Sequence, residues 1–270
     1  MLCAEYDARK HPANAIAEVK ASRRQSTETT QYDGMMVLAE DGRLINRKGR
    51  DTTNQFPEIR VDPTVVLVGE IVILQNGLSQ FHMMQRRNTD NPKEVALRSK
   101  LYPATLIAFD VLEVKGQDFS KDPLSARRKL LENLEKTGLV NDHVFVAGYW
   151  GCPKDKVEDY LRLMRDQDAE GIIVKDLDAF YEAKRGQAWM KLKAWKEGEY
   201  DILRHETTEN DGFVVWISNK GREQKVVVNK VDLQNRIKSG SVQRLVIRYL
   251  TEEDTGALRQ AHVYGLPMRR

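Results

Sequence analysis

The chain has 270 residues, a length that predicts one large domain or two unequal ones. It contains 43 Lys and Arg against 40 Asp and Glu, so its formal net charge is +3, which excludes a strongly basic packaging protein and an acidic tail protein. No apolar run approaches the roughly 18 residues that span a bilayer and the N-terminus lacks a signal-peptide core, so we expect no membrane partner. Cys3 and Cys152 are too few for a disulfide framework or a cysteine zinc site. We therefore expect a cytoplasmic protein whose metal ligands are mainly oxygen atoms.

The first predicted element is a helix over residues 10–22, where Ala15, Ile16 and Val19 recur at helical spacing. A polar stretch follows, and the pattern then changes to strands and helices. The expected elements are a hairpin around Asp41-Gly42 within 35–49, a buried strand or strand pair at 64–74 closed by a turn at 75–77, a strand at 105–116, helices at 123–140 and 153–168, and a short strand at 170–176.

The composition changes near residues 194–198. From there to the C-terminus the sequence consists of short alternating strands separated by Gly, Asn and Asp, with one helical segment near 231–239. This pattern is typical of a small β-barrel. We therefore predict an α+β chain with one domain over residues 1–195 and a second over 196–270.

Two lysines in the sequence Trp-Met-Lys-Leu-Lys at 189–193 suggest the chemistry of the site. On a strand, Lys191 and Lys193 point to the same face, and burying two like charges side by side is costly unless an anion lies beside them. A polyphosphate is the natural anion. Glu70 and Glu170 lie next to apolar runs and supply the opposite charge. A carboxylate near phosphates is repulsive unless it holds a sugar hydroxyl or a divalent cation. A nucleotide with magnesium is the simplest interpretation.

Short charged motifs follow one another in order along the chain, and together they carry a family resemblance. Their order and spacing resemble those of the covalent nucleotidyltransferases, the ATP-dependent polynucleotide ligases and mRNA capping enzymes, whose first motif is Lys-x-Asp-Gly. The matching segments are QYDG at 31–34, NRKG at 46–49, VGE at 68–70, AFD at 108–110, EGIIVK at 170–175 and WMKLK at 189–193.

The resemblance implies a fold and a class of enzyme. It predicts an ATP-grasp-like nucleotidyltransferase domain of antiparallel sheets and helices over 1–195, followed by a small OB-fold β-barrel over 196–270. Residues 246–270 resemble the last strands of the ligase OB barrel. The whole is similar to the minimal two-domain form of ATP-dependent DNA ligase, and we expect a monomer that binds ATP and nicked duplex DNA.

The resemblance also implies roles for individual residues. In such ligases a lysine attacks the α-phosphate of ATP, AMP passes to a 5′-phosphate at a nick, and the 3′-hydroxyl displaces AMP. The implied roles are neutralisation of the α-phosphate by Lys191 and Lys193, ribose binding by Glu70, adenine stacking by Phe109, a ribose or nick-phosphate contact by Arg47, magnesium binding by Glu170 and Asp33, and further nucleotide contacts by Thr29, Tyr32, Asp33, Gly34, Lys175 and Arg185.

The nucleophile position departs from the family pattern, because Gln31 stands where the motif has lysine. The nitrogen of a glutamine amide has its lone pair delocalised into the carbonyl and cannot attack ATP. We therefore expect that this chain does not self-adenylate, whether Gln31 is an introduced or a natural substitution. Sealing of a pre-adenylated nick needs no lysine nucleophile and is expected to survive. Met36 stands where many family members have an arginine.

Alternatives to a DNA ligase remain open at this point. An RNA ligase shares the chemistry, and the motifs do not fix contacts to the 2′-hydroxyl. A capping guanylyltransferase fits the Trp-x-Lys-x-Lys motif less well. A catalytically silent nucleic-acid-binding relative is the reading that Gln31 favours.

Overall fold

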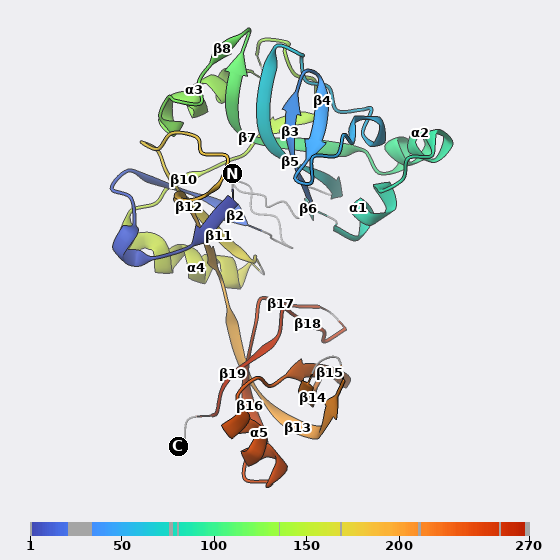
Figure 1. Ribbon diagram of the computed structural model, residues 1–270, viewed down its shortest axis with the longest axis vertical. Coiled ribbons are helices and arrows are strands. Elements are labelled where there is room, and N and C mark those ends of the chain that lie inside the picture. The colour runs from blue at the N-terminus through green and yellow to red at the C-terminus, as the bar shows by residue number, and fades with distance from the viewer. Residues whose placement is uncertain are drawn as a thin grey trace. The chain divides into compact units, whose positions relative to one another are not determined.

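A computed structural model of the chain describes residues 2–20, 34–75, 78–79, 81–134, 136–167, 169–209, 212–253 and 255–267. The chain divides into two compact units, one formed by Met1–Gln167 with Gly171–Leu192 and the other by Asp168–Glu170 with Lys193–Arg270. Figure 1 shows two β-sheets in the first unit and a curled sheet in the second. Within the ranges just given, no helix is both long and apolar enough to cross a membrane.

The first sheet of the first unit has five strands. In pairing order these are β1 (Leu2–Glu5), β12 (Arg185–Lys193), β11 (Gly171–Asp176), β2 (Ala15–Lys20) and β10 (Trp150–Gly151). β1 runs parallel to β12, whereas β2 runs antiparallel to both β11 and β10. The short strand predicted at 170–176 is thus confirmed as β11.

The predicted helix over 10–22 is wrong. Among the described residues 2–20, only Ala8–Lys10 forms a helical turn and residues 15–20 form β2, while residues 21 and 22 lie outside the described residues. The successive residues Ile16 and Ala17 are both buried, because β2 lies between two neighbouring strands and is covered on both faces. An apolar run of this length has no periodicity that separates a doubly covered strand from a buried helix.

The second sheet contains the hairpin and both of the long strands that the sequence predicts. Its main order is β4 (Arg43–Asn46), β3 (Met35–Glu40), β5 (Val65–Gln75), β7 (Ala104–Val114) and β8 (Gln117–Asp118), with β6 (Leu78–Ser79) beside β5 and β9 (Val144–Val146) beside β7. The hairpin turn has φ values of 52° at Asp41 and 71° at Gly42, as two-residue turns of this kind require. Part of the turn expected at 75–77 lies outside the described residues.

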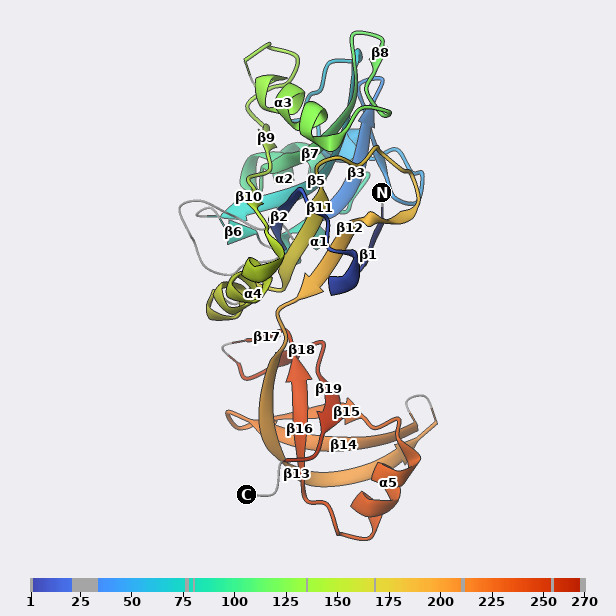
Figure 2. The ribbon, with the colours of Figure 1, turned by 90° about the vertical axis from the view of Figure 1, so that its left-hand side faces the viewer.

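The described residues of the first unit form four α-helices, which are α1 (Phe81–Arg87), α2 (Pro92–Leu101), α3 (Leu124–Leu134) and α4 (Val157–Asp166). α3 packs against β7, α4 against β11 and α1 against β5 (Figure 2). The helices predicted at 123–140 and 153–168 are confirmed as α3 and α4, but α3 ends before the predicted Gly138. Short helical turns also occur at Thr53–Gln55 and Lys154–Lys156.

The second unit is a curled antiparallel sheet with one helix. Its strands pair in the order β15 (Arg222–Val227), β14 (Gly212–Asn219), β13 (Lys196–Thr208), β16 (Arg244–Tyr249) and β19 (His262–Gly265), and the remaining elements are β17 (Thr251–Glu252), β18 (Leu258–Arg259) and α5 (Val231–Lys238). The first half of β13 pairs with β16 and its second half with β14. The outermost strands β15 and β19 also contact each other, so the sheet curls into a small barrel, as predicted.

Candidate active site

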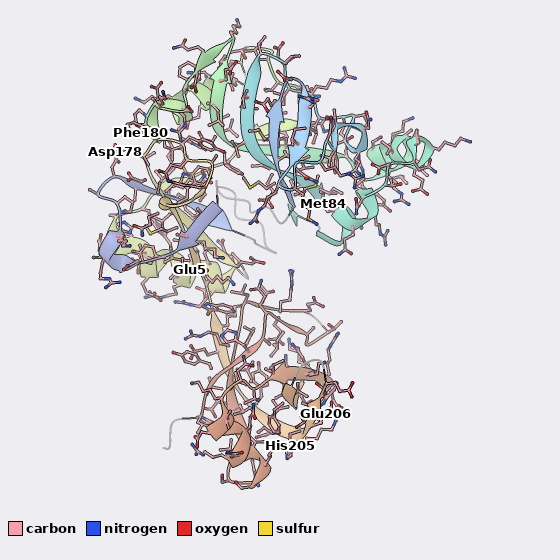
Figure 3. All side chains as sticks on the ribbon, in the orientation of Figure 1. Glu5, Met84, Asp178, Phe180, His205 and Glu206 are labelled. Atoms are coloured by element: carbon pink, nitrogen blue, oxygen red, sulfur yellow. The ribbon has the colours of Figure 1, made fainter. Side chains whose placement is uncertain are left out.

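A cavity of about 600 Å³ opens beside the hairpin of the second sheet. Its lining comes from β3, β5, α1 and the segment after β4, and consists of Gly34, Met35, Met36, Asn46, Arg47, Lys48, Arg50, Gln55, Phe56, Glu70, Met84, Gln85 and Asn88. Met84 is the contribution of α1 that Figure 3 labels. The lining contains three basic residues and one carboxylate, a composition that favours an anionic ligand.

Glu70 holds the start of β3 at this cavity. Its Oε1 atom accepts a hydrogen bond from the backbone N–H of Gly34 at 2.9 Å. Any Cβ atom at residue 34 would lie 2.0 Å from the carbonyl oxygen of Ile71, so only glycine fits there. The structure therefore brings together Gly34, Arg47 and Glu70, three of the residues that the sequence predicts for the nucleotide site.

Glu70 and Phe109 lie on adjacent strands at an irregular point of the second sheet. In the pairing of β5 with β7, Val68 is opposite Asp110 and Gly69 is opposite Ala108, so Phe109 is the extra residue of a β-bulge. A Cβ atom at Gly69 would lie 2.6 Å from the carbonyl oxygen of Ile107, which requires glycine at this point. A bulge redirects the side chain of the strand that carries it.

The aromatic ring of Phe109 meets the first sheet. It lies edge-on to Trp189 of β12, with 5.5 Å between the ring centroids. The Nζ atom of Lys175 on β11 is 4.7 Å from the centroid of Phe109 and 3.9 Å from that of Trp189. Phe109 and Lys175 are not among the residues that line the 600 Å³ cavity. The predicted site residues thus form two groups, one at the cavity and one between the sheets.

A buried carboxylate accompanies the second group. The Oε2 atom of Glu18 on β2 is 2.6 Å from Nζ of Lys175, and its Oε1 atom is 3.5 Å from Nη1 of Arg128 on α3. Arg128 also donates to the carbonyl oxygen of Ala147 at 2.6 Å. Burial lowers the pKa of Lys175 below its usual value, although the carboxylate of Glu18 opposes that change.

The two lysines of the Trp-Met-Lys-Leu-Lys motif have different partners. Lys191 is half-buried in the first unit, and its Nζ atom is 3.1 Å from Oε1 of Glu5, which Figure 3 labels on β1. Lys193 belongs to the second unit, where its ammonium group donates to Oε1 of Gln260 at 2.9 Å and lies 4.8 Å from the ring centroid of Trp195. Neither lysine is buried in an apolar environment as the sequence suggested.

Glu170 directly precedes β11 and is buried. Its carbonyl oxygen accepts a hydrogen bond from the N–H of Ala194 at 2.7 Å. The residues that the structure describes contain no group of three or more His, Cys, Asp or Glu that could hold a metal ion. The chemistry of Glu170 fits the usual magnesium arrangement in nucleotide sites, where one or two carboxylates act together with substrate phosphates.

Several predicted site residues lie outside the described part of the chain. These are Thr29, Gln31, Tyr32 and Asp33, and the side chain of Arg185 is likewise not described. The backbone of Arg185 begins β12 opposite Leu2. The roles assigned to these residues stay predictions.

Sequence reasoning missed Glu18 and Arg128, the two charged partners around Lys175. The signal for Glu18 was a carboxylate inside the apolar run of residues 15–19, which an amphipathic helix would have placed in solvent. Arg128 is one of two adjacent arginines on α3 that are both buried, Arg127 being paired with Asp110. Nothing in the periodicity of α3 separates these arginines from solvated ones.

The two sheets with a basic cavity, and the five-stranded barrel later in the chain, define a nucleotidyltransferase domain followed by an OB-fold domain. A solved structure titled "DNA binding with a minimal scaffold: Structure-function analysis of Lig E DNA ligases" has the same fold, with a TM-score of 0.70 at 15% identity, and the match covers 99% of this chain and 98% of the other. The ligase domain of LigD from M. tuberculosis matches with a TM-score of 0.55 at 22% identity, over 99% of this chain and 94% of that one.

Sequence comparison places the chain within one family. The family model described as "ATP dependent DNA ligase domain" matches residues 9–193. The chain belongs to this family.

Curated relatives agree with that membership. A probable DNA ligase of Streptomyces coelicolor is 29% identical over 198 residues, which are 68% of this chain and 38% of that protein. The multifunctional non-homologous end joining DNA repair protein LigD of Mycobacterium tuberculosis is 32% identical over 200 residues, which are 69% of this chain and 24% of that protein. The chain thus spans well under half of the length of the curated relatives it matches.

Proposed function

We propose that this chain is the catalytic part of an ATP-dependent polynucleotide ligase that seals nicks between a 5′-phosphate and a 3′-hydroxyl in duplex DNA through enzyme-AMP and DNA-adenylate intermediates. The observation that carries the proposal is the link between Gly34 and Glu70 in a cavity whose lining has an excess of positive charge. Its volume of about 600 Å³ lies within the range of small-molecule sites.

The predicted site residues have different roles in nucleotide binding. Glu70 orients the ribose, and Arg47 contacts the ribose or the phosphate at the nick. Phe109, redirected by its bulge, offers an aromatic face to adenine. Lys191 and Lys193 neutralise charge that develops on the α-phosphate, since fixed cations stabilise a displacement at phosphorus.

Magnesium, when bound beside Glu170 and Asp33, supplies further neutralisation of phosphate charge. The protein's own contribution is to position the phosphates and to hold the ribose. Each of the three steps is a displacement at phosphorus that needs the attacking and leaving oxygen or nitrogen atoms in line.

Two forms of the proposal differ in the first step. In one, residue 31 is the nucleophile position, so Gln31 blocks self-adenylation and the chain acts only on DNA that already carries AMP. In the other, a lysine elsewhere in the chain attacks ATP. Both forms predict sealing of a pre-adenylated nick, so that reaction tests the ligase function separately from the origin of the AMP.

The test uses a nicked duplex whose 5′-phosphate already carries AMP, incubated with magnesium and the protein, with the sealed strand resolved on a denaturing gel. We expect sealing, a lower rate for Arg47→Ala, and an unchanged rate for the control Arg43→Ala, because Arg43 is exposed on β4 and does not line the cavity. Binding of the nick without sealing would instead indicate a catalytically silent nucleic-acid-binding relative. A strong preference for a ribonucleotide strand at the nick would indicate an RNA ligase.

A further inference from the structure

We infer that Arg50 binds a phosphate group of the substrate in the cavity of about 600 Å³, and that Asp90 and Gln55 are positioning residues for its guanidinium group. The inference rests on the proposed ligase function and adds to it a phosphate-binding residue that lies outside the sequence motifs. The phosphate belongs either to the nicked DNA or to ATP, and separate binding assays distinguish these two sources.

Arg50 ends a tight turn whose backbone is fixed by Asn46 at the other end. The side-chain oxygen Oδ1 of Asn46 accepts the backbone N–H groups of Lys48 at 2.9 Å and of Arg50 at 3.1 Å. The backbone N–H of Asn46 donates to the carbonyl oxygen of Arg50 at 2.9 Å. Gly49 supplies the positive φ of 77° within the turn. An asparagine that accepts backbone N–H groups in this way stabilises a turn, so the backbone of residue 50 is ordered without a ligand.

The segment that follows Arg50 is attached to β4. The hydroxyl group of Thr52 donates to the carbonyl oxygen of Leu44 at 2.9 Å, and the backbone N–H of Leu44 donates to Oγ1 of Thr53 at 2.8 Å. Arg50 therefore lies between two segments that are each held to the second sheet by hydrogen bonds.

The guanidinium group of Arg50 is held at one of its nitrogen atoms. Its Nη2 atom is paired with Oδ2 of Asp90. The other carboxylate oxygen, Oδ1 of Asp90, accepts a hydrogen bond from Nε2 of Gln55 at 2.8 Å, and Gln55 is only 3% exposed. The hydrogen bond from Gln55 and the charge of Arg50 hold the pKa of Asp90 below its usual value. A buried amide thus fixes an ionised carboxylate, and the carboxylate orients the arginine.

The remaining donors of Arg50 are available to a ligand. Within the described part of the chain, Nε and Nη1 of Arg50 make no hydrogen bond. Arg50 lines the cavity and Asp90 does not, so the carboxylate holds the guanidinium group from outside the cavity. Guanidinium N–H groups form charge-assisted hydrogen bonds with phosphate oxygens, often as bidentate pairs. An arginine that is already oriented also loses less side-chain entropy when the phosphate binds.

The rest of the lining suits the other parts of a nucleotide. Arg47 and Lys48 add positive charge on the same turn as Arg50. The apolar part of the lining consists of Met35, Met36, Phe56 and Met84. Sites for small molecules commonly combine an apolar wall with a few placed polar groups. A phosphate at Arg50 with its sugar or base against the apolar wall fits this division.

An ion pair of the same kind beside β4 provides matched controls. Nη2 of Arg43 is 3.3 Å from Oδ2 of Asp41. The side chains of Arg43 and Asp41 are 54% and 72% exposed, and those of Arg50 and Asp90 are 53% and 68% exposed. Neither Arg43 nor Asp41 lines the cavity. Exposed pairs contribute little to stability, so we expect variants of both pairs to fold and only those at the cavity to affect binding.

The experiment measures two dissociation constants of the full chain, for a nicked duplex by fluorescence anisotropy without magnesium and for ATP by calorimetry with magnesium. We expect Arg50→Ala to weaken one of them about tenfold, because it removes charge-assisted hydrogen bonds, and Arg43→Ala to leave both unchanged. A loss confined to the duplex assigns the phosphate to DNA, and a loss confined to ATP assigns it to the nucleotide. For DNA, the slope of log K against log salt concentration should also fall by about 1 in Arg50→Ala and stay unchanged in Arg50→Lys, which keeps the charge.

Replacement of Asp90 tests its positioning role by the sign of the effect. If Asp90 orients Arg50, Asp90→Ala weakens binding of the same ligand about threefold and has no further effect in the Arg50→Ala chain. A carboxylate that only repels the phosphate would have the opposite effect, since its removal would tighten binding in both chains. Tighter binding by Asp90→Ala would therefore overturn the assignment of Asp90, and Asp41→Ala is the control for the lost charge.

Sealing of the pre-adenylated nick separates this inference from the proposed function. If the unchanged chain seals that nick while Arg50→Ala binds both the nicked duplex and ATP as tightly as the unchanged chain does, Arg50 binds no substrate phosphate and the inference is overturned. Failure of the unchanged chain to seal would refute the ligase function, and the two dissociation constants would still decide whether Arg50 binds a phosphate.

Discussion

Replacing Glu18 is expected to destabilise the first unit far more than replacing its partner Lys175. Glu18 is the carboxylate shared by two cations, since it lies 2.6 Å from Nζ of Lys175 and 3.5 Å from Nη1 of Arg128. The side chains of Lys175 and Arg128 are 0% and 3% exposed. Glu18→Gln leaves these two buried cations without their shared counter-charge, whereas Lys175→Met leaves Glu18 paired with Arg128.

The geometry sets the expected magnitudes. Removing one partner of a buried ion pair costs about 3–5 kcal/mol when it leaves an uncompensated charge, and we expect Glu18→Gln to fall in this range. Lys175→Met keeps an apolar stem of similar length beside Phe109 and Trp189 and leaves no uncompensated carboxylate, so its cost is expected to be about 1–2 kcal/mol. The two variants should thus differ by about 1–4 kcal/mol, with Glu18→Gln the less stable.

Urea denaturation followed by tryptophan fluorescence measures this difference, because the transition midpoint reports stability when the slope is unchanged.

The ion pair of Glu18 with Lys175 also predicts a pH dependence of stability. Burial lowers the pKa of Lys175 in the folded chain from its usual 10.5, so the unfolded chain binds more protons between the two values. The stability of the unchanged chain relative to Lys175→Met should therefore rise as pH rises through that window. If Lys175→Met lowers the free energy of unfolding as much as Glu18→Gln does at neutral pH, Glu18 is not the shared counter-charge of Lys175 and Arg128.

Three further expectations follow from single contacts. Gly34→Ala should lower the free energy of unfolding by about 1–3 kcal/mol, seen as a lower melting temperature, because the new Cβ atom would overlap a backbone carbonyl oxygen. The control Gly151→Ala should have little effect, because a Cβ atom there meets nothing within 4 Å. Burial raises the pKa of Cys152 to about 11, so a thiol reagent at pH 8 should modify it only after urea is added. Arg127→Met should cost about 3–5 kcal/mol in urea denaturation, because it leaves the fully buried carboxylate of Asp110 without its bidentate partner.

The hairpin and the two long strands of the second sheet could be predicted from the sequence because each of them carries its own local signal. The pair Asp41-Gly42 marks the hairpin, and the segments at 64–74 and 105–116 are long and mostly apolar, with several β-branched residues. β2 carries no such signal, since its burial comes from β11 and β10, which lie more than a hundred residues further along the chain. The sequence pattern of a strand covered on both faces depends on partners that a local window does not contain.

The sequence motifs predict individual site residues but not how these residues are arranged. The motifs identify Glu70 and Phe109, yet the bulge that shifts Phe109 out of register with Gly69 depends on the pairing of β5 with β7. The partners of Lys175 are similarly hidden, because Glu18 and Arg128 come from a different strand and from a helix. In the sequence, buried charged residues at these positions look the same as solvent-exposed ones. Only the fold shows which of them are buried.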